Sequence, residues 1–161
     1  MTRAEFEALA VQVAAALARR FEGLYLTPYL CPAGVATIGY GATFYEDGVR
    51  VTLQDPPITR SRAEALLLWM VRTTYLSAVL KLCPGADTPG RLAALIDFAF
   101  NLGAGRLAAS TLRKRVNAGR WEEVPAEIRK WNRGGGHVLR GLVLRREAEA
   151  ALISVQTSGL L

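Results

Sequence analysis

Histidine and cysteine are both scarce in this sequence. The chain of 161 residues has a single histidine, His137, and two cysteines, Cys31 and Cys83. Zinc sites normally take four ligands, most of them cysteine or histidine. One histidine and two cysteines 52 positions apart therefore exclude an ordinary zinc site. We expect no metal, and no motif in the sequence implies an organic cofactor.

Neither cysteine is expected to form a disulfide. The most apolar N-terminal run, residues 8–18, has no small-residue cleavage site after it, so it is not typical of a secretory signal. A chain without such a signal stays in a reducing compartment, where disulfides are rare. The alternative is a bridge between Cys31 and Cys83, which would require their Cα atoms to approach within about 7 Å.

The sequence is also short of long hydrophobic runs. A membrane-spanning helix needs roughly 18 to 20 apolar residues. The run at residues 8–18 is interrupted by Gln12 and ends at Arg19 and Arg20. We therefore expect no segment long enough to cross a membrane and no stable membrane insertion.

Acidic residues are outnumbered by basic ones. Lys and Arg total 20 against 14 Asp and Glu, which gives a net charge of +6 and a sequence pI of about 9.8. A basic surface favours polyanions such as nucleic acid, anionic lipid or a bacterial envelope. A nucleic-acid-binding protein would gather these cations in one helix or arm with aromatics between them. Here they are scattered, which argues against a nucleic-acid partner. Three small clusters are interpreted as solvated helix faces: Arg60 and Arg62, residues 113–115, and Arg145 and Arg146.

The sequence begins with a helix and continues with turn-rich segments. With 51% hydrophobic and 21% charged residues, the chain suits one compact domain or two small lobes. Helical spacing of apolar residues over 4–20, behind a capping box of Thr2 and Glu5, predicts a first helix that ends near Glu22 and Gly23. Alternating runs between glycines and prolines then predict a small three-stranded sheet, with strands at 24–26, 35–40 and 49–53.

Helical signals dominate the rest of the chain. A capping box of Ser61 and Glu64 opens a helix of about 20 residues, which is apolar on most sides, is therefore expected to be buried, and ends at Pro84 and Gly85. Cap and breaker residues predict further helices at 88–103, 110–119, 121–131 and, after a flexible glycine turn, 138–153. The fold class is α+β, mainly α: an N-terminal β-hairpin lobe (1–60), a connecting helix (61–83) and a helical lobe (84–161).

Three residues in the turn-rich segment are the best candidates for chemistry. Eight residues separate Glu22 from Cys31, and five separate Cys31 from Thr37. A sheet that folds back on the first helix would turn Thr37 towards Glu22, so that a carboxyl group, a thiol and a hydroxyl could act on one bond by acid catalysis. From spacing alone, Glu22 could equally pair with Arg145 or Arg146, and Thr37 could be an ordinary strand residue.

The segment FEGLYLTPYLCPAGVATIGYGAT, residues 21–43, resembles the catalytic signature of the phage lysozymes, glycoside hydrolase family 24. In that family a glutamate, an aspartate or cysteine, and a threonine at this spacing form a catalytic triad. Three further blocks resemble the helical lobe of phage endolysins in order and spacing: IDFAFNLGAG at 96–105, STLRKRVNAG at 110–119 and KWNRGGGHVLRGLVLRREAE at 130–149. The resemblance covers most of the chain and implies one lysozyme-like catalytic domain over residues 1–161.

The resemblance implies an endolysin that lyses its host by cutting peptidoglycan. The bond would be the β-1,4 linkage between N-acetylmuramic acid and N-acetylglucosamine. Glu22 would be the general acid, which must carry its proton near neutral pH and would therefore need an apolar site. Thr37 would hold the attacking water with Cys31. Since glycosidases typically use two carboxyl groups, Cys31 could be a thiolate beside a cation, a nucleophile, or a residue that only fills the site.

The same resemblance suggests which residues line the substrate cleft. Asn101 would bond an N-acetyl group, although Phe100 and Asn101 could also be helix core and helix cap. Trp131 is expected to build the helical lobe rather than touch sugar. The residues expected at the cleft are Tyr40, Thr43, Phe100, Asn101 and Thr111.

The implied partner is the peptidoglycan glycan strand, and the protein is expected to be a monomer. Because it lacks the signal-anchor helix of some endolysins, it would collect in the host cytoplasm and depend on a holin to reach the wall. Two alternatives remain. A lytic transglycosylase would cut the same bond with the substrate's own hydroxyl and leave an anhydro product. A non-catalytic peptidoglycan-binding protein would have no need of all three triad positions.

Overall fold

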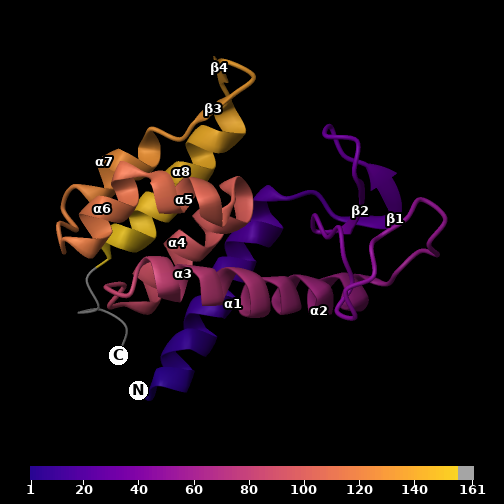
Figure 1. Cartoon of the computed structure of the whole chain (residues 1–161), viewed down its shortest axis with the longest axis horizontal. Coiled ribbons are helices and arrows are strands. Elements are labelled where there is room, and N and C mark those ends of the chain that lie inside the picture. Colours follow the sequence, from indigo (N-terminus) through magenta and orange to yellow (C-terminus); the bar gives the residue numbers. More distant parts are fainter. Residues whose placement is uncertain (156–161) are drawn as a thin grey trace.

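The computed structural model describes residues 1–155. It has a helical body and a smaller β-containing part, joined by one long helix (Figure 1). Helix α1 (Arg3–Phe21) begins with the predicted capping box, in which Thr2 and Glu5 bond each other's backbone N–H. Its C-cap is Glu22. The helix therefore places Glu22 at the junction between the helical body and the β-containing part.

The small sheet is a two-stranded hairpin, not the predicted three-stranded sheet. Strands β1 (Tyr25–Leu30) and β2 (Ala36–Gly39) are antiparallel, and Tyr29 pairs with Thr37. The run at 49–53 contributes only an isolated bridge between Arg50 and Phe44. The chain leaves the sheet there because the side chain of Asp55 accepts hydrogen bonds from the backbone and hydroxyl of Thr52, which closes a turn in place of a strand.

The connecting helix runs from Arg60 to Leu82 as α2 (Arg60–Met70), a π-helical segment η1 (Val71–Leu76) and α3 (Ser77–Leu82). Its N-cap is Thr59, whose hydroxyl accepts from the backbone N–H of Arg62. The predicted capping box at Ser61 is therefore wrong, and Glu64 pairs instead with Arg19.

The predicted burial of this helix is also wrong in its middle. Arg72, Thr73 and Thr74 are exposed, so one face of η1 is open to solvent. The segment of 23 residues, with a mean hydropathy of 1.3 over its most apolar window, is long and apolar enough to cross a membrane by length and composition. The expectation that no segment reaches that length is wrong. In this fold the buried residues of the helix belong to both core clusters.

The helical lobe is built around α4 (Pro89–Leu102), which packs against α1 and against α8 (Arg140–Ser154). The predicted caps of α4 are confirmed: Thr88 accepts from Arg91 N at 3.1 Å, and Gly103 ends the helix with a φ of 95°. Residues 92–99 are all buried. The helix α5 (Ala104–Ala109) was not expected from the sequence. The lobe is completed by α6 (Thr111–Asn117), α7 (Val124–Arg129) and the hairpin of β3 (Arg133–Gly134) and β4 (His137–Val138).

Two hydrophobic clusters fix the relative position of hairpin and helices. The large one surrounds α4 and includes residues of α1, α8 and the connecting helix. The small one joins Ile38, Ala42 and Val51 to Leu66 of α2. Ile38 follows Thr37 directly, so its burial against α2 also fixes the strand that carries Thr37.

Candidate functional site

Glu22 lies at the C-terminal end of α1 and is partly accessible. Its side chain is 29% exposed, and its Oε1 accepts a hydrogen bond of 2.7 Å from Nη1 of Arg145. This is the arginine pairing that spacing alone left open. The expectation of an apolar site around Glu22 is wrong, because the carboxylate lies in an ion pair.

Cys31 and Thr37 lie together at the turn between β1 and β2. The backbone N–H of Cys31 donates to Val35 O at 3.0 Å, and the buried hydroxyl of Thr37 donates to the same carbonyl at 2.9 Å. The pKa of the half-buried Cys31 thiol is lowered by hydrogen bonds to its sulfur, first from the backbone at Val35, then from that at Ala33 and from the Thr37 side chain. Thr37 therefore lies close enough to the thiol to contribute to the lowering of its pKa.

Tyr29 connects this turn to Glu22. Burial raises the pKa of Tyr29, and so do the charges of Tyr25, Cys31 and Glu22. The ring of Tyr29 lies against that of Tyr25, with 4.0 Å between the ring centres. In the hairpin, residue Tyr29 is the cross-strand partner of Thr37. Glu22 and Cys31 both lie close enough to this tyrosine to influence its pKa, and the predicted approach of Thr37 to Glu22 stays a prediction. Sequence reasoning did not select Tyr29.

An open groove lies between the loop that follows β2, at residues 41–48, and the connecting helix. Its cavity volume is about 380 Å³, and Tyr75 of η1 forms part of its wall. Burial and the charge of Glu22 raise the pKa of Tyr75, and its ring packs edge-on against Phe100 at 5.2 Å. Tyr75 therefore both lines the groove and responds to the charge of Glu22. Its lining residues are Gly41, Thr43, Phe44, Gly48, Trp69, Met70, Thr74 and Tyr75.

The structure brings some of the predicted cleft residues to this groove and places others elsewhere. Thr43 lines it, and Phe100 borders it through Tyr75. Asn101 uses its Oδ1 to accept from Arg146 at 2.9 Å, which leaves its amide N–H₂ to donate. Tyr40 is buried and donates its hydroxyl to Glu64, and Thr111 is exposed at the start of α6. Substrate contact by these residues stays a prediction.

Sequence reasoning also missed the wall of the groove on the connecting helix. Trp69 and Tyr75 belong to the helix that the sequence predicts to be buried, yet both line the groove. The available signal was the polar stretch of Arg72, Thr73 and Thr74, which interrupts an otherwise apolar helix and coincides with η1. Single π-helical turns are frequent at functional sites.

Arg145 and Arg146 are buried, so their interpretation as a solvated helix face is wrong. Arg145 donates two hydrogen bonds to the carboxylate of Asp97 on α4, from Nε at 2.8 Å and from Nη2 at 2.7 Å. Burial opposes the charge of Arg145, but hydrogen bonds to Asp97 and Glu22 outweigh it and hold the pKa above its ordinary value. Arg145 therefore anchors Glu22 to the core of the helical lobe.

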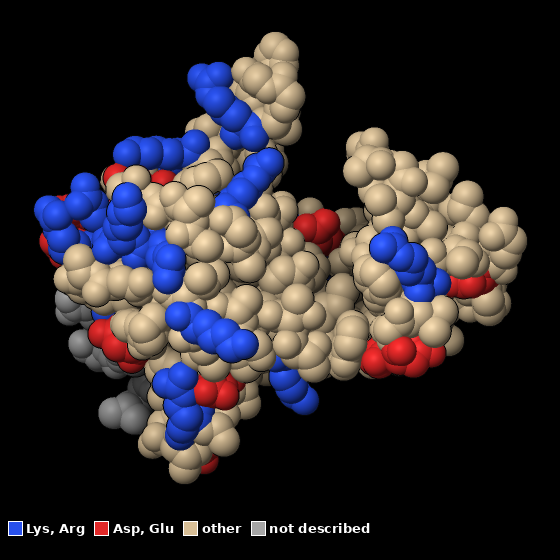
Figure 2. All heavy atoms as spheres, in the orientation of Figure 1, with Lys and Arg blue, Asp and Glu red and all other residues tan. Residues whose placement is uncertain are grey.

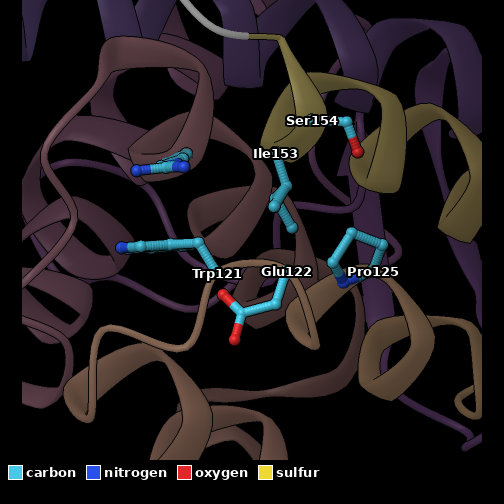
Figure 3. Close-up of a pocket in the computed structure, with 6 residues that line it drawn as sticks. Trp121, Glu122, Pro125, Ile153 and Ser154 are labelled. Carbon is cyan, nitrogen blue, oxygen red and sulfur yellow. The ribbon is translucent and has the colours of Figure 1, made fainter.

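Other parts of the molecule offer less chemistry. A second hollow of about 330 Å³ lies between α7 and the end of α8 (Figure 3). The guanidinium of Arg91, which also lines it, covers the ring of Trp121 at 4.2 Å. None of the predicted site residues lines it.

Cys31 and Cys83 are both free, and burial raises the pKa of Cys83 to about 11. Trp131 packs edge-on against Phe98 at 5.4 Å, as part of the lobe. Residues 1–155 contain no cluster of three His, Cys, Asp or Glu side chains that could hold a metal.

The surface charge is uneven. On the face shown in Figure 2, Lys and Arg side chains gather over the helical lobe. The hairpin part on the same face carries fewer of them, with acidic side chains beside them. Many basic side chains of the described residues are paired with acidic neighbours, for example Arg62 with Glu46, Arg91 with Asp87 and Arg129 with Glu147.

Known proteins resemble this chain in both sequence and structure. A family model described as phage lysozyme matches residues 19–149. The endolysin of Bacillus phage B103 is 38% identical over 138 residues, which are 84% of this chain and 50% of that protein. The endolysin of Acyrthosiphon pisum secondary endosymbiont phage 1 is 35% identical over 84% of this chain and 91% of its own length. The structure of the endolysin from Escherichia coli O157:H7 phage FAHEc1 matches with a TM-score of 0.78 and 31% identity, covering 89% of this chain and 91% of that one.

The matched segment contains the whole site. It starts three residues before Glu22 and ends at Glu149, so it includes the thiol, the hydroxyl, the groove and the buried arginines. The chain spans about half the length of the Bacillus phage endolysins that it matches. The family model covers far more than half of this chain, and the structural match extends over both lobes. The chain therefore belongs to the phage lysozyme family.

Proposed function

We propose that this chain is an endolysin domain, over residues 1–161, that hydrolyses the β-1,4 bond between N-acetylmuramic acid and N-acetylglucosamine in bacterial peptidoglycan. One observation carries the proposal: Glu22 and Cys31 both lie close enough to Tyr29 for their charges to raise its pKa, and Tyr29 pairs across the hairpin with Thr37. A carboxyl group on one side of a groove and a water-holding pair on the other is what hydrolysis of a glycosidic bond needs.

Glu22 is the proton donor in this proposal. Arg145 occupies its Oε1, and within residues 1–155 no hydrogen bond to Oε2 is formed. Oε2 is therefore the oxygen that carries the proton to the leaving glycosidic oxygen. The guanidinium of Arg145 is shared between Asp97 and Glu22, and its contact with Glu22 fixes the direction of the Glu22 carboxyl group. A positioned general acid typically contributes about 10² to 10⁴ in rate.

The attacking water is held by Thr37 and Cys31. The Thr37 hydroxyl has lone pairs that can accept from water while its hydrogen points to Val35 O or to the Cys31 sulfur. The lowered pKa of Cys31 increases its thiolate fraction, and a thiolate accepts a hydrogen bond from water. Direct attack by this water would invert the anomeric carbon.

The groove suits a glycan strand. Phe44, Trp69 and Tyr75 offer ring faces and edges to the apolar faces of the sugars. Asn101 keeps a free amide donor for an N-acetyl carbonyl. We propose further that the protein acts as a monomer, accumulates in the host cytoplasm with both thiols free, and reaches the wall after a holin has permeabilised the membrane.

A zymogram on purified cell walls tests the proposed function. The protein should clear a zone in the gel at its own mass, and heat-denatured protein should not. A protein that binds the walls in a pull-down but clears no zone would be a wall-binding protein instead.

Cys31 gives a separate prediction about the attacking water. Cys31→Asp should keep lysis within about tenfold of the parent, and Cys31→Ala should lose more, because only the former retains an acceptor for the water. Lysis by the Asp variant should be insensitive to iodoacetamide. The mechanism is read from the first-formed anomer by NMR: direct attack by water gives inversion. A retained anomer, together with loss of parent activity on alkylation, would make Cys31 the nucleophile.

A further inference from the structure

The connecting helix changes its register once, inside η1. Its buried residues in the large core cluster are Ala63, Leu67, Val71, Leu76 and Val79. They are spaced by four positions up to Val71, and Leu76 then follows five positions later. In an α-helix a residue five positions on points about 140° away. A π-helical turn bonds residue i to residue i+5, so it keeps both halves of the helix in the core.

The same turn determines which side chains face the groove. Trp69, Met70, Thr74 and Tyr75 line it. Thr74 follows Trp69 by five positions, and Tyr75 follows Met70 by five. In a continuous α-helix the members of each pair would point in different directions. The π-helical turn therefore brings two hydroxyl-bearing side chains into the groove beside Trp69 and Met70.

Thr73 supports the turn without entering the groove. Its hydroxyl donates to the backbone carbonyl of Trp69, four positions earlier, at 2.7 Å. A threonine that bonds back to its own helix in this way favours a local departure from regular α-helical geometry. Thr73 is exposed and is not one of the residues that line the groove. Its hydroxyl therefore serves the backbone, and the hydroxyls of Thr74 and Tyr75 serve the groove.

The hydroxyls of Thr74 and Tyr75 are not used by the protein itself. Within residues 1–155 neither forms a hydrogen bond, whereas the hydroxyl of Tyr40 donates to Glu64. Tyr75 is only partly exposed, and a tyrosine in such surroundings usually has a partner for its O–H. Burial, and next the charge of Glu22, raise the pKa of Tyr75, so its hydroxyl stays a donor at neutral pH. Two donors in one stretch of the groove are thus available to a ligand.

Phe100 holds the ring of Tyr75 from the helical lobe. The two rings pack edge to face with 5.2 Å between their centres. Phe100 belongs to α4, whose residues 92–99 are all buried. Tyr75 is therefore ordered by the fold before any ligand arrives, which lowers the entropic cost of binding.

We propose that the π-helical turn holds the glycan strand: Thr74 and Tyr75 donate their hydroxyl hydrogens to oxygen atoms of the sugar that lies against Trp69, and Tyr75 keeps that sugar in place for Glu22. A sugar ring has an apolar face and a rim of acceptor oxygens, which an indole flanked by two hydroxyls can bind. The identity of this sugar as a unit of peptidoglycan rests on the proposed function.

Calorimetric titration with soluble, uncross-linked peptidoglycan strands tests the two hydroxyls. The titrations use the Glu22→Gln background, so that the strands stay intact. Thr74→Val and Tyr75→Phe should each weaken binding by about threefold to tenfold, the worth of one hydrogen bond. Neither should change the thermal midpoint, because neither hydroxyl bonds the protein. Ser77→Ala removes an exposed hydroxyl of the same helix outside the groove and should bind like the parent. Binding by both hydroxyl variants as tight as that of the control would overturn the proposal.

Wall hydrolysis by the variants separates this proposal from the proposed function. In the active protein, Thr74→Val and Tyr75→Phe should lower kcat/KM by the same factor by which they weaken binding. If the parent hydrolyses no wall, the proposed function fails, and the titrations still decide whether Thr74 and Tyr75 bind the strand. If the parent hydrolyses walls and both variants bind and cleave like it, only the role of these two residues is wrong.

Two single-residue deletions test the register of the helix. Deleting Thr73 leaves Thr74 and Tyr75 four positions after Trp69 and Met70, where side chains of an α-helix are still neighbours. This deletion should therefore keep both the thermal midpoint and the binding of the strand. Deleting Ala65, an exposed residue in the regular part of the same helix, should lower the thermal midpoint strongly, because it turns one flank out of the core. Equal damage by the two deletions would contradict the register assigned to the π-helical turn.

Discussion

Glu22→Gln is expected to slow wall lysis by at least about 100-fold while leaving the fold intact. Glutamine has the shape of glutamate and can still accept from Arg145 Nη1, but it has no acidic proton to give to the glycosidic oxygen. Lysis is measured as the clearing of a suspension of purified walls. Folding is followed by circular dichroism and by the thermal midpoint.

Glu7→Gln is the matched control for this prediction. Glu7 also lies on α1, its side chain is 29% exposed like that of Glu22, and it too is paired with an arginine, Arg3. It lies far along α1 from the groove, so its loss should leave lysis unchanged. If the Glu22 variant clears walls about as fast as the Glu7 variant, Glu22 is not the proton donor.

The largest effect on stability is expected at Arg145. Arg145→Met should lower the free energy of unfolding by about 3 to 5 kcal/mol, because it leaves Asp97 as a buried carboxylate without its partner. The measurement is denaturant unfolding at neutral pH. Asp97→Asn, added to Arg145→Met, should recover part of the loss, since it removes the unpaired charge.

Arg129→Met provides the comparison for Arg145. Arg129, at the end of α7, pairs with Glu147 of α8, the helix that also carries Arg145. Both side chains of this pair are about half exposed. An exposed pair of this kind is worth at most about 1 kcal/mol. Similar losses for the two variants would mean that the network around Arg145 does not contribute to stability in the way its burial indicates.

Local signals in the sequence predicted the helix ends well. Thr2, Thr88 and Ser110 are N-caps, and Gly103 ends α4, as expected. Each of these signals acts within one turn of helix, through a side chain that bonds a backbone N–H three residues later or through a backbone angle that glycine adopts without strain. Such contacts do not depend on the rest of the fold.

Predictions that depended on tertiary surroundings were less reliable. Arg145 and Arg146 look like a solvated pair, yet they are buried because Asp97 and Glu149 receive them. The connecting helix looks buried all round, but its exposed stretch at Arg72 to Thr74 is part of η1, whose residues Thr74 and Tyr75 line the groove. A local pattern cannot specify which distant element packs against it.

In the candidate site, too, the residues close together in the sequence could be predicted and those brought in by distant elements could not. Glu22, Cys31 and Thr37 lie within 16 residues of sequence and could be recognised by their spacing. Arg145 is 123 positions from Glu22, and no periodicity connects the two. The sequence offers Arg145 only as one of two possible partners of Glu22, and the fold decides between them. The aromatic wall at Trp69 and Tyr75 is visible only in the folded molecule.

Mass spectrometry of the fragments released from purified peptidoglycan tests the central claim most directly. Hydrolysis by water should give muropeptides with a reducing N-acetylmuramic acid end, and Glu22→Gln should release almost none of them. Fragments that end in anhydro-N-acetylmuramic acid would show a transglycosylase, and release of peptides with intact glycan strands would show that another bond is cut. Either of these results would contradict the account given for Glu22, Cys31 and Thr37.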